Sequence, residues 1–173
     1  MQEQTLQQSK NSDVSGDIAR ENMMQFLTFE LNAEVYGINI LNIKEIIDFG
    51  NLTRVPMMPE FIAGVINLRG SVVPVVDLAL RFLEKPSPRT KRSSIVILEL
   101  EHESQKLEIG ITVDVVNEVL DILSNDIETA PSFGTKIRTD FISGMGKVSN
   151  QLLVLLDVET ILSIDELSIV TLQ

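Results

Sequence analysis

The chain has 173 residues, a formal net charge of -11 and no cysteine. Disulfides, thiolate catalysis and zinc–cysteine sites are therefore excluded, and so acidic a surface argues against binding to the phosphate backbone of nucleic acids. Hydrophobic residues make up 44% of the chain, which is typical of a globular protein, and no apolar stretch approaches the ~20 residues that a membrane-spanning helix needs.

The N-terminal segment, residues 1–22, is rich in Gln, Ser and Asn and has no apolar core of the kind found in signal peptides. We expect it to form a flexible tail that precedes one folded region at 23–167. Together with the absence of cysteine, this favours a cytoplasmic protein without direct membrane insertion.

The first part of the folded region predicts a hairpin and a helix. Residues 26–31 and 35–38 alternate loosely around a polar tripeptide, a pattern typical of two paired strands. In 39–47 the isoleucines recur at helical spacing behind Asn39, a good N-cap residue, so we predict a helix there. Two prolines then indicate an extended connection at 51–59.

The next segment, VINLRGSVVPVVDL at 65–78, contains two apolar runs around Asn67-Leu68-Arg69-Gly70 and predicts a second hairpin. Gly70 tolerates the positive φ that a tight turn needs, but the turn gives no reason for an arginine. The guanidinium of Arg69 suits either a contact with a partner or an intramolecular salt bridge. The polar residues 84–94 that follow this region are interpreted as a solvated connector.

The second half repeats the first. Residues 95–100 correspond to 26–31, and 117–119 to 44–46; from 141–144, which correspond to 61–64, the match continues without a gap at a shift of 141 − 61 = 80. We infer a duplication, with repeat 1 at about 25–84 and repeat 2 at about 95–165, arranged around a pseudo-twofold axis. Each repeat would supply about five strands and a helix, and small antiparallel sheets of this kind usually close into a barrel or sandwich.

The sequence lacks a catalytic constellation. The single histidine, His102, lies in a polar turn and cannot build a triad or a metal cluster by itself. Asp77 and Asp157 hold equivalent positions and would make a hydrolase dyad if the duplication brought them together. Aspartate is also a good N-cap, so we interpret Asp77, Asp157 and Asp114 as caps. We predict no enzyme activity, no cofactor and no metal site.

Taken together, these residues resemble the chemotaxis coupling protein (CheW) family from about Gln25 to about Leu167. The most specific part is the run N-L-R-G-x-V-x-P-V-V-D-L at 67–78. Other landmarks lie at compatible spacing: the residues 26–29, 36–38, 43–46, 59–66, 110–114, 119–120 and 141–146.

The resemblance implies two five-stranded, SH3-like β-barrel subdomains with short helices, between which strands can be exchanged. It implies the stand-alone form of the family, a non-enzymatic scaffold recruited to membrane-associated receptor arrays. One surface would hold the cytoplasmic tip of a chemoreceptor, and another the regulatory domain of a CheA-type histidine kinase. The kinase-binding residues stay unassigned.

For the receptor contact, the resemblance implies a groove between the subdomains with Ile43, Glu45, Gly64, Arg69 and Val119 as contact residues. Helix-in-groove recognition explains these residue types, since apolar Ile43 and Val119 suit an apolar helix stripe and the charges of Glu45 and Arg69 fix the register. Gly64 would let a backbone approach closely. Because Arg69 has no counterpart in the second repeat, a partner contact is favoured over a purely internal salt bridge.

Overall fold

The computed structural model describes residues 22–50, 52–130 and 139–162, which form two β-sheets. Residues 1–21 of the predicted tail at 1–22, and the predicted domain end at 163–167, lie outside the described residues. One sheet has the strand order β8 (Val115–Leu123), β1 (Met23–Leu31), β2 (Glu34–Asn39), β11 (Gln151–Leu156), β10 (Ile142–Val148) and β9 (Ile127–Glu128). The other has the order β3 (Ile43–Asp48), β6 (Ser94–His102), β7 (Gln105–Val113), β5 (Ser71–Val76) and β4 (Ile62–Leu68). The mainly β class is confirmed.

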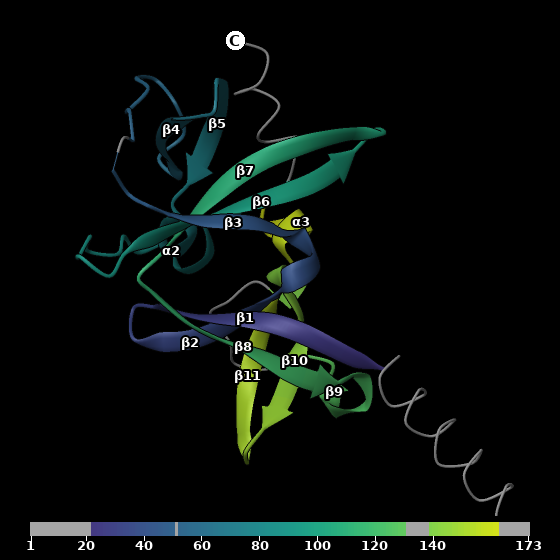
Figure 1. Cartoon of the computed structure of the whole chain (residues 1–173). Coiled ribbons are helices and arrows are strands. Elements are labelled where there is room, and N and C mark those ends of the chain that lie inside the picture. Colours follow the sequence, from purple (N-terminus) through teal and green to yellow (C-terminus); the bar gives the residue numbers. More distant parts are fainter. Residues whose placement is uncertain (1–21, 51, 131–138, 163–173) are drawn as a thin grey trace, which may run out of the picture.

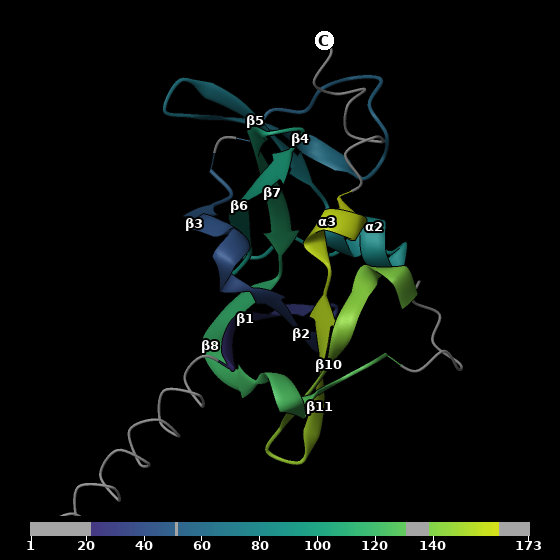
Figure 2. The same cartoon turned by 90° about the vertical axis from the view of Figure 1, so that its right-hand side faces the viewer.

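The two sheets form separate lobes, with the short helices α2 (Leu78–Leu83) and α3 (Val158–Ile161) between them (Figures 1 and 2). Each sheet combines strands from both halves of the chain. The parallel pairing of β5 with β7 joins Val75 to Gly110, and that of β11 with β2 joins Leu155 to Gly37. The first hairpin of each half therefore completes the sheet of the other half.

The duplication is visible in the register of the strands. In the hairpin β4–β5, Ile62 pairs with Val76 and a bulge precedes Gly64; in β10–β11, Ile142 pairs with Leu156 and the same bulge precedes Gly144. Each position is shifted by 142 − 62 = 80, the offset seen in the sequence. The repeat therefore reflects equivalent backbone geometry as well as similar residue types.

The prediction of closed five-stranded barrels is wrong, since the sheets have six and five strands and both are open. Within the described residues no ladder joins the end strands β3 and β4 of the five-stranded sheet. The sheet nevertheless curls, since Ile47 of β3 and Ile66 of β4, from its two end strands, belong to the same small core. A strongly twisted sheet can bring its end strands together in this way without backbone pairing.

The predicted helix at 39–47 is also wrong. Asn39 does act as an N-cap, because its Oδ1 accepts from the backbone N–H of Leu41 at 2.9 Å. The turn that it caps is only the 3-10 segment Ile40–Asn42, after which β3 begins. The isoleucines of this segment are β-branched and favour a strand, and burial alternates along β3 as pairing with β6 requires.

A central core joins the two lobes. Tyr36 from β2 meets the ring of Phe82 from α2 edge-on at 5.3 Å, and Phe82 lies 6.3 Å from the ring of Phe141. Arg81 extends this junction, since its guanidinium lies over Phe61 and Phe141 and its Nε donates to the carbonyl of Ile161 at 2.9 Å. These contacts fix the two halves relative to each other and hold the surface strands in place.

Candidate functional site

Four of the five predicted receptor-contact residues lie on β3, on β8 and in the β4–β5 turn. Ile43 and Glu45 are on β3, Arg69 is in the β4–β5 turn, and Val119 is on β8. The strands β3 and β8 face the viewer in Figure 1 and lie on the left in Figure 2. We call this surface, with the neighbouring Ile46 of β3, the β3–β8 face.

Arg69 pairs with Glu45 across the curled sheet. The NH2 group of Arg69 donates to Oε1 of Glu45, while the arginine side chain stays 67% exposed. The turn places it there with positive φ at both Arg69 and Gly70, and Oδ1 of Asn67 accepts from the N–H of Gly70 at 2.9 Å. Arg69 thus forms the intramolecular salt bridge that the sequence left open, and the exposed part of its guanidinium remains accessible to a partner.

The apolar side chains of the face follow the duplication. Val119 is 49% exposed, and Ile46, its counterpart in the first repeat, is 43% exposed. Ile43 is only partly buried and packs against the central core. Sequence reasoning selected Ile43 and missed Ile46, although the alignment of 117–119 with 44–46 already placed Ile46 opposite Val119. Ile46 and Val119 are therefore equivalent exposed apolar side chains on β3 and β8.

Gly64 has a role within the fold. A Cβ built on it would lie well inside 3.0 Å of the carbonyl oxygen of Thr53, whose backbone pairs with Val65 in both directions. Gly144, its counterpart, likewise approaches the carbonyl of Glu128. The backbone that comes close to Gly64 is thus the chain's own, and a further contact of Gly64 with a receptor stays a prediction.

A charged network lies beside the Arg69–Glu45 pair. Lys44 bonds to Glu108 and lies 3.9 Å from Glu99, which Lys106 also approaches at 3.4 Å. The hydrogen bond to Glu108 raises the pKa of Lys44, which stays positively charged at neutral pH. Because these pairs are at the surface, they contribute little to stability and mainly set the charge pattern of the face.

The candidate dyad does not form. Oδ1 of Asp77 accepts from the N–H of Leu80 at 3.0 Å, and Oδ1 of Asp157 accepts from that of Thr160 at 3.2 Å. Each aspartate therefore caps its own short helix, and the two line different cavities. A carboxylate pair that shares a proton must be in direct contact, so this geometry offers no hydrolytic site.

The helix-cap prediction for Asp114 is wrong, because β8 and not a helix follows it. Its Oδ2 instead accepts from the N–H of Asn32 at 2.8 Å and from the hydroxyl of Ser87 at 3.2 Å. Asp114 thus fixes the β1–β2 turn and the connector at once. Within the described residues no group of three or more His, Asp or Glu side chains could hold a metal ion.

Asp77 provides a test of the cap. Burial, with a smaller contribution from the charge of Asp114, raises the carboxyl pKa of Asp77 above 3.8. The folded state then binds the proton more tightly than the unfolded chain, so the contribution of Asp77 to stability falls as pH rises through the interval above 3.8. Asp77→Asn keeps the cap but cannot ionise. In urea titrations we therefore expect the free energy of unfolding of this variant, relative to that of wild type, to increase from acidic to neutral pH. Asp77→Ala should lose about 1 kcal/mol.

Comparison with known proteins identifies the class. The family model of the CheW-like domain matches residues 25–166. Chemotaxis protein CheW of Klebsiella aerogenes is 36% identical over 146 residues, which cover 84% of this chain and 86% of that protein. Chemotaxis protein CheW of Helicobacter pylori is 34% identical over 145 residues, 84% of this chain and 85% of that protein.

The solved structures agree. The crystal structure of the scaffolding protein TtCheW from Thermoanaerobacter tengcongensis has a TM-score of 0.73 and 33% identity, and the match covers 83% of this chain and 90% of that chain. The fold and site are those of a signalling scaffold and not of an enzyme. The chain belongs to the CheW-like family, whose role in chemotaxis is to couple receptors to the kinase CheA. None of the helices in the described residues is long and apolar enough to cross a bilayer.

Proposed function

We propose that the chain works in the cytoplasm at membrane-associated receptor arrays, where its β3–β8 face receives the cytoplasmic tip of a chemoreceptor. A second surface would hold the regulatory domain of a CheA-type histidine kinase. The observation that carries the receptor assignment is the Arg69–Glu45 pair, whose arginine side chain is 67% exposed, beside a strand that also bears the exposed Ile46. We also retain 23–167 as the extent of the domain that does this.

The chemistry of the face suits an amphipathic helix. Ile46 and Val119 would meet its apolar stripe, because exposed aliphatic side chains gain most when a partner removes them from water. Arg69 would contact a carboxylate or carbonyl of the receptor through the donors that Glu45 leaves free, and the two charges would fix the register. This recognition needs no rearrangement of the sheets.

The direct test is Arg69→Ala. The ion pair is exposed, so its loss should change the free energy of unfolding by less than ~1 kcal/mol. Co-sedimentation with receptor-bearing membranes should weaken by about tenfold, as expected for the loss of a charge-assisted hydrogen bond. Arg92→Ala removes the same charge from the exposed connector and should bind like wild type.

A charge swap separates partner contact from internal pairing. The double variant Glu45→Arg/Arg69→Glu can rebuild the internal ion pair with its polarity reversed. If Arg69 contacts the receptor, the swap stays defective in co-sedimentation although the protein is folded. Full recovery of binding in the swap would contradict the assignment, as would an Arg69→Ala variant whose binding falls only in proportion to its loss of folded protein.

A further inference from the structure

A buried threonine occupies a position that the fold otherwise gives to an aliphatic side chain. Thr28 of β1 is 3% exposed, and the alignment of 26–31 with 95–100 makes it the counterpart of Ile97 of β6. Ile97 is fully buried in the small core of its own lobe. A buried hydroxyl costs free energy unless it is hydrogen-bonded, so the bonds of Thr28 should indicate why a threonine is present.

The Thr28 hydroxyl holds both backbone groups of one residue on the neighbouring strand β8, which lies beside β1 (Figures 1 and 2). Its Oγ1 donates to the carbonyl oxygen of Glu118 at 2.7 Å and accepts from the N–H of Glu118 at 3.1 Å. The register of the two strands shifts at this point, so that Thr28 alone stands opposite Asn117 and Glu118. The hydroxyl therefore satisfies the backbone where the ladder is interrupted.

The first repeat has the bulge but not the hydroxyl. In β3 the register shifts between Ile43 and Glu45, which leaves Lys44 as the extra residue. Lys44 is the counterpart of Asn117, so the bulge lies at the equivalent place in both strands. Glu45 is itself paired in the ladder, whereas Glu118 is held through a side chain. The bulge thus forms without a threonine, and the hydroxyl is a special feature of β8.

The difference between the two bulges appears in the exposure of the residues that follow them. Asn117, Glu118 and Val119 are all exposed, although a regular strand would turn every second side chain inward. In β3 the counterpart Glu45 is partly buried between two exposed neighbours. Within the described residues no ion pair involves Glu118. An available carboxylate therefore stands directly beside the exposed side chain of Val119.

We propose that Glu118 is a further contact residue, which binds a Lys or Arg side chain of the receptor helix, and that Thr28 positions it. This rests on the proposed function, in which Val119 meets the apolar stripe of the same helix. A basic residue beside that stripe would lie next to the Glu118 carboxylate, and such a charge pair would help to set the register. Thr28 is buried and touches no partner, so it acts through the backbone of β8.

Glu118→Gln tests the contact, because it removes the charge and keeps the size of the side chain. Co-sedimentation of the full chain with receptor-bearing membranes should weaken by about three- to fivefold at low salt, as expected for an exposed charge pair. The difference from wild type should shrink as salt is added, because salt screens exposed charges. Glu101→Gln removes the same charge from β6 and should bind like wild type.

Thr28→Val tests the positioning, because it replaces the hydroxyl with a methyl group. We expect the amide proton of Glu118 to exchange with solvent at least about tenfold faster in NMR measurements, as the loss of a hydrogen bond predicts. Receptor co-sedimentation should weaken by about threefold or more, since Glu118 and Val119 are then both misplaced. Thr28→Ser keeps the hydroxyl and should restore both the slow exchange and the binding.

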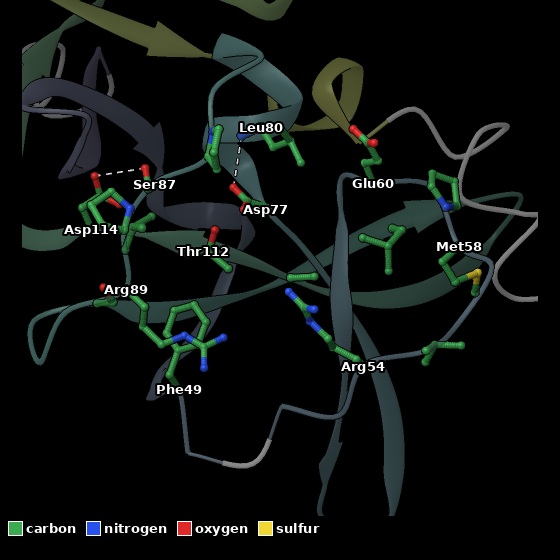
Figure 3. A pocket seen from close by; sticks show the side chains of 18 of the residues that line it. Phe49, Arg54, Met58, Glu60, Asp77, Leu80, Ser87, Arg89, Thr112 and Asp114 are labelled. Carbon is green, nitrogen blue, oxygen red and sulfur yellow. Dashed lines mark hydrogen bonds between the residues drawn. The ribbon is translucent and has the colours of Figure 1, made fainter.

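Thr112→Val is the matched control for a lost buried hydroxyl. Thr112 of β7 is 9% exposed and lies near Asp77 in a cavity of about 960 Å³ at the start of α2 (Figure 3). Its Oγ1 accepts from the N–H of Leu78 at 3.2 Å, so its replacement removes a buried bond without changing β8. Circular dichroism melts measure the folding of each variant, and Thr112→Val should bind the receptor in proportion to its folded fraction.

The background Glu118→Gln/Val119→Ala separates positioning from a general loss of stability. With both positioned side chains removed, Thr28→Val should weaken binding no further. The inference would be overturned by an equal loss in that background, by wild-type binding of Glu118→Gln at low salt, or by unchanged exchange of the Glu118 amide in Thr28→Val. If Arg69→Ala and Val119→Ala still weaken binding in these cases, the receptor assignment stands and only this inference fails. If they too bind like wild type, the proposed function fails with it.

Discussion

Gly64→Ala is expected to lower the free energy of unfolding by roughly 2–4 kcal/mol. The added methyl group would be driven into the carbonyl oxygen of Thr53, and a backbone atom cannot move aside as the end of a side chain can. The two hydrogen bonds between Thr53 and Val65, at 2.9 and 2.8 Å, would be strained or lost. Urea denaturation followed by circular dichroism measures the loss.

The matched control for Gly64 is Gly70→Ala. Gly70 also has a positive φ, of 89°, but nothing lies within 4 Å of the position that its Cβ would take. Only the backbone cost then applies, about 1 kcal/mol. If Gly64→Ala is no more destabilising than Gly70→Ala, the close approach of Thr53 is not what requires a glycine at 64.

Phe82→Ala is expected to cost about 3–5 kcal/mol, the range for deleting a buried phenyl ring. Phe82 is 4% exposed and lies at the junction of the lobes, where it contacts the rings of Tyr36 and Phe141. The cavity left behind would therefore weaken the contact between the two halves as well as the local packing of α2. Chemical denaturation monitored by circular dichroism gives the free energy, and the fluorescence of the single tyrosine, Tyr36, reports on the junction itself.

Leu41→Ala is the control for Phe82. Leu41 is 87% exposed in the 3-10 segment, and its truncation should change stability by no more than about 0.5 kcal/mol. A similar loss in both variants would mean that the ring cluster does not hold the lobes together.

The duplication carries most of the fold information that the sequence contains. The offset of 80 predicts which residues are equivalent, and the bulges before Gly64 and Gly144 and the caps at Asp77 and Asp157 follow it. The segment 39–47 was mispredicted because its isoleucines fit both a helical and a strand period. Pairing with β6, which is distant in sequence, decides between them.

The site shows where long-range geometry limits prediction. The asymmetry of Arg69 between the repeats was readable from the sequence, but its pairing with Glu45 was not. The two residues lie near opposite ends of the strand order, and only the curl of the sheet brings them together. The cap prediction for Asp114 failed for a similar reason, because its partners Asn32 and Ser87 come from the β1–β2 turn and from the connector, which are distant in sequence. The exposure of Ile46 could have been predicted from its alignment with Val119, since these equivalent positions of the duplication are similarly exposed.

The central claim is that this chain links a receptor to a kinase. The most direct measurement is the autophosphorylation rate of a CheA-type kinase mixed with receptor-bearing membranes, with and without the chain. The account predicts that receptor-dependent activation appears only when the chain is present and is weakened by Arg69→Ala, while the kinase without membranes is unaffected. A kinase rate that is the same with and without the chain, under conditions where both partners are active, would contradict it.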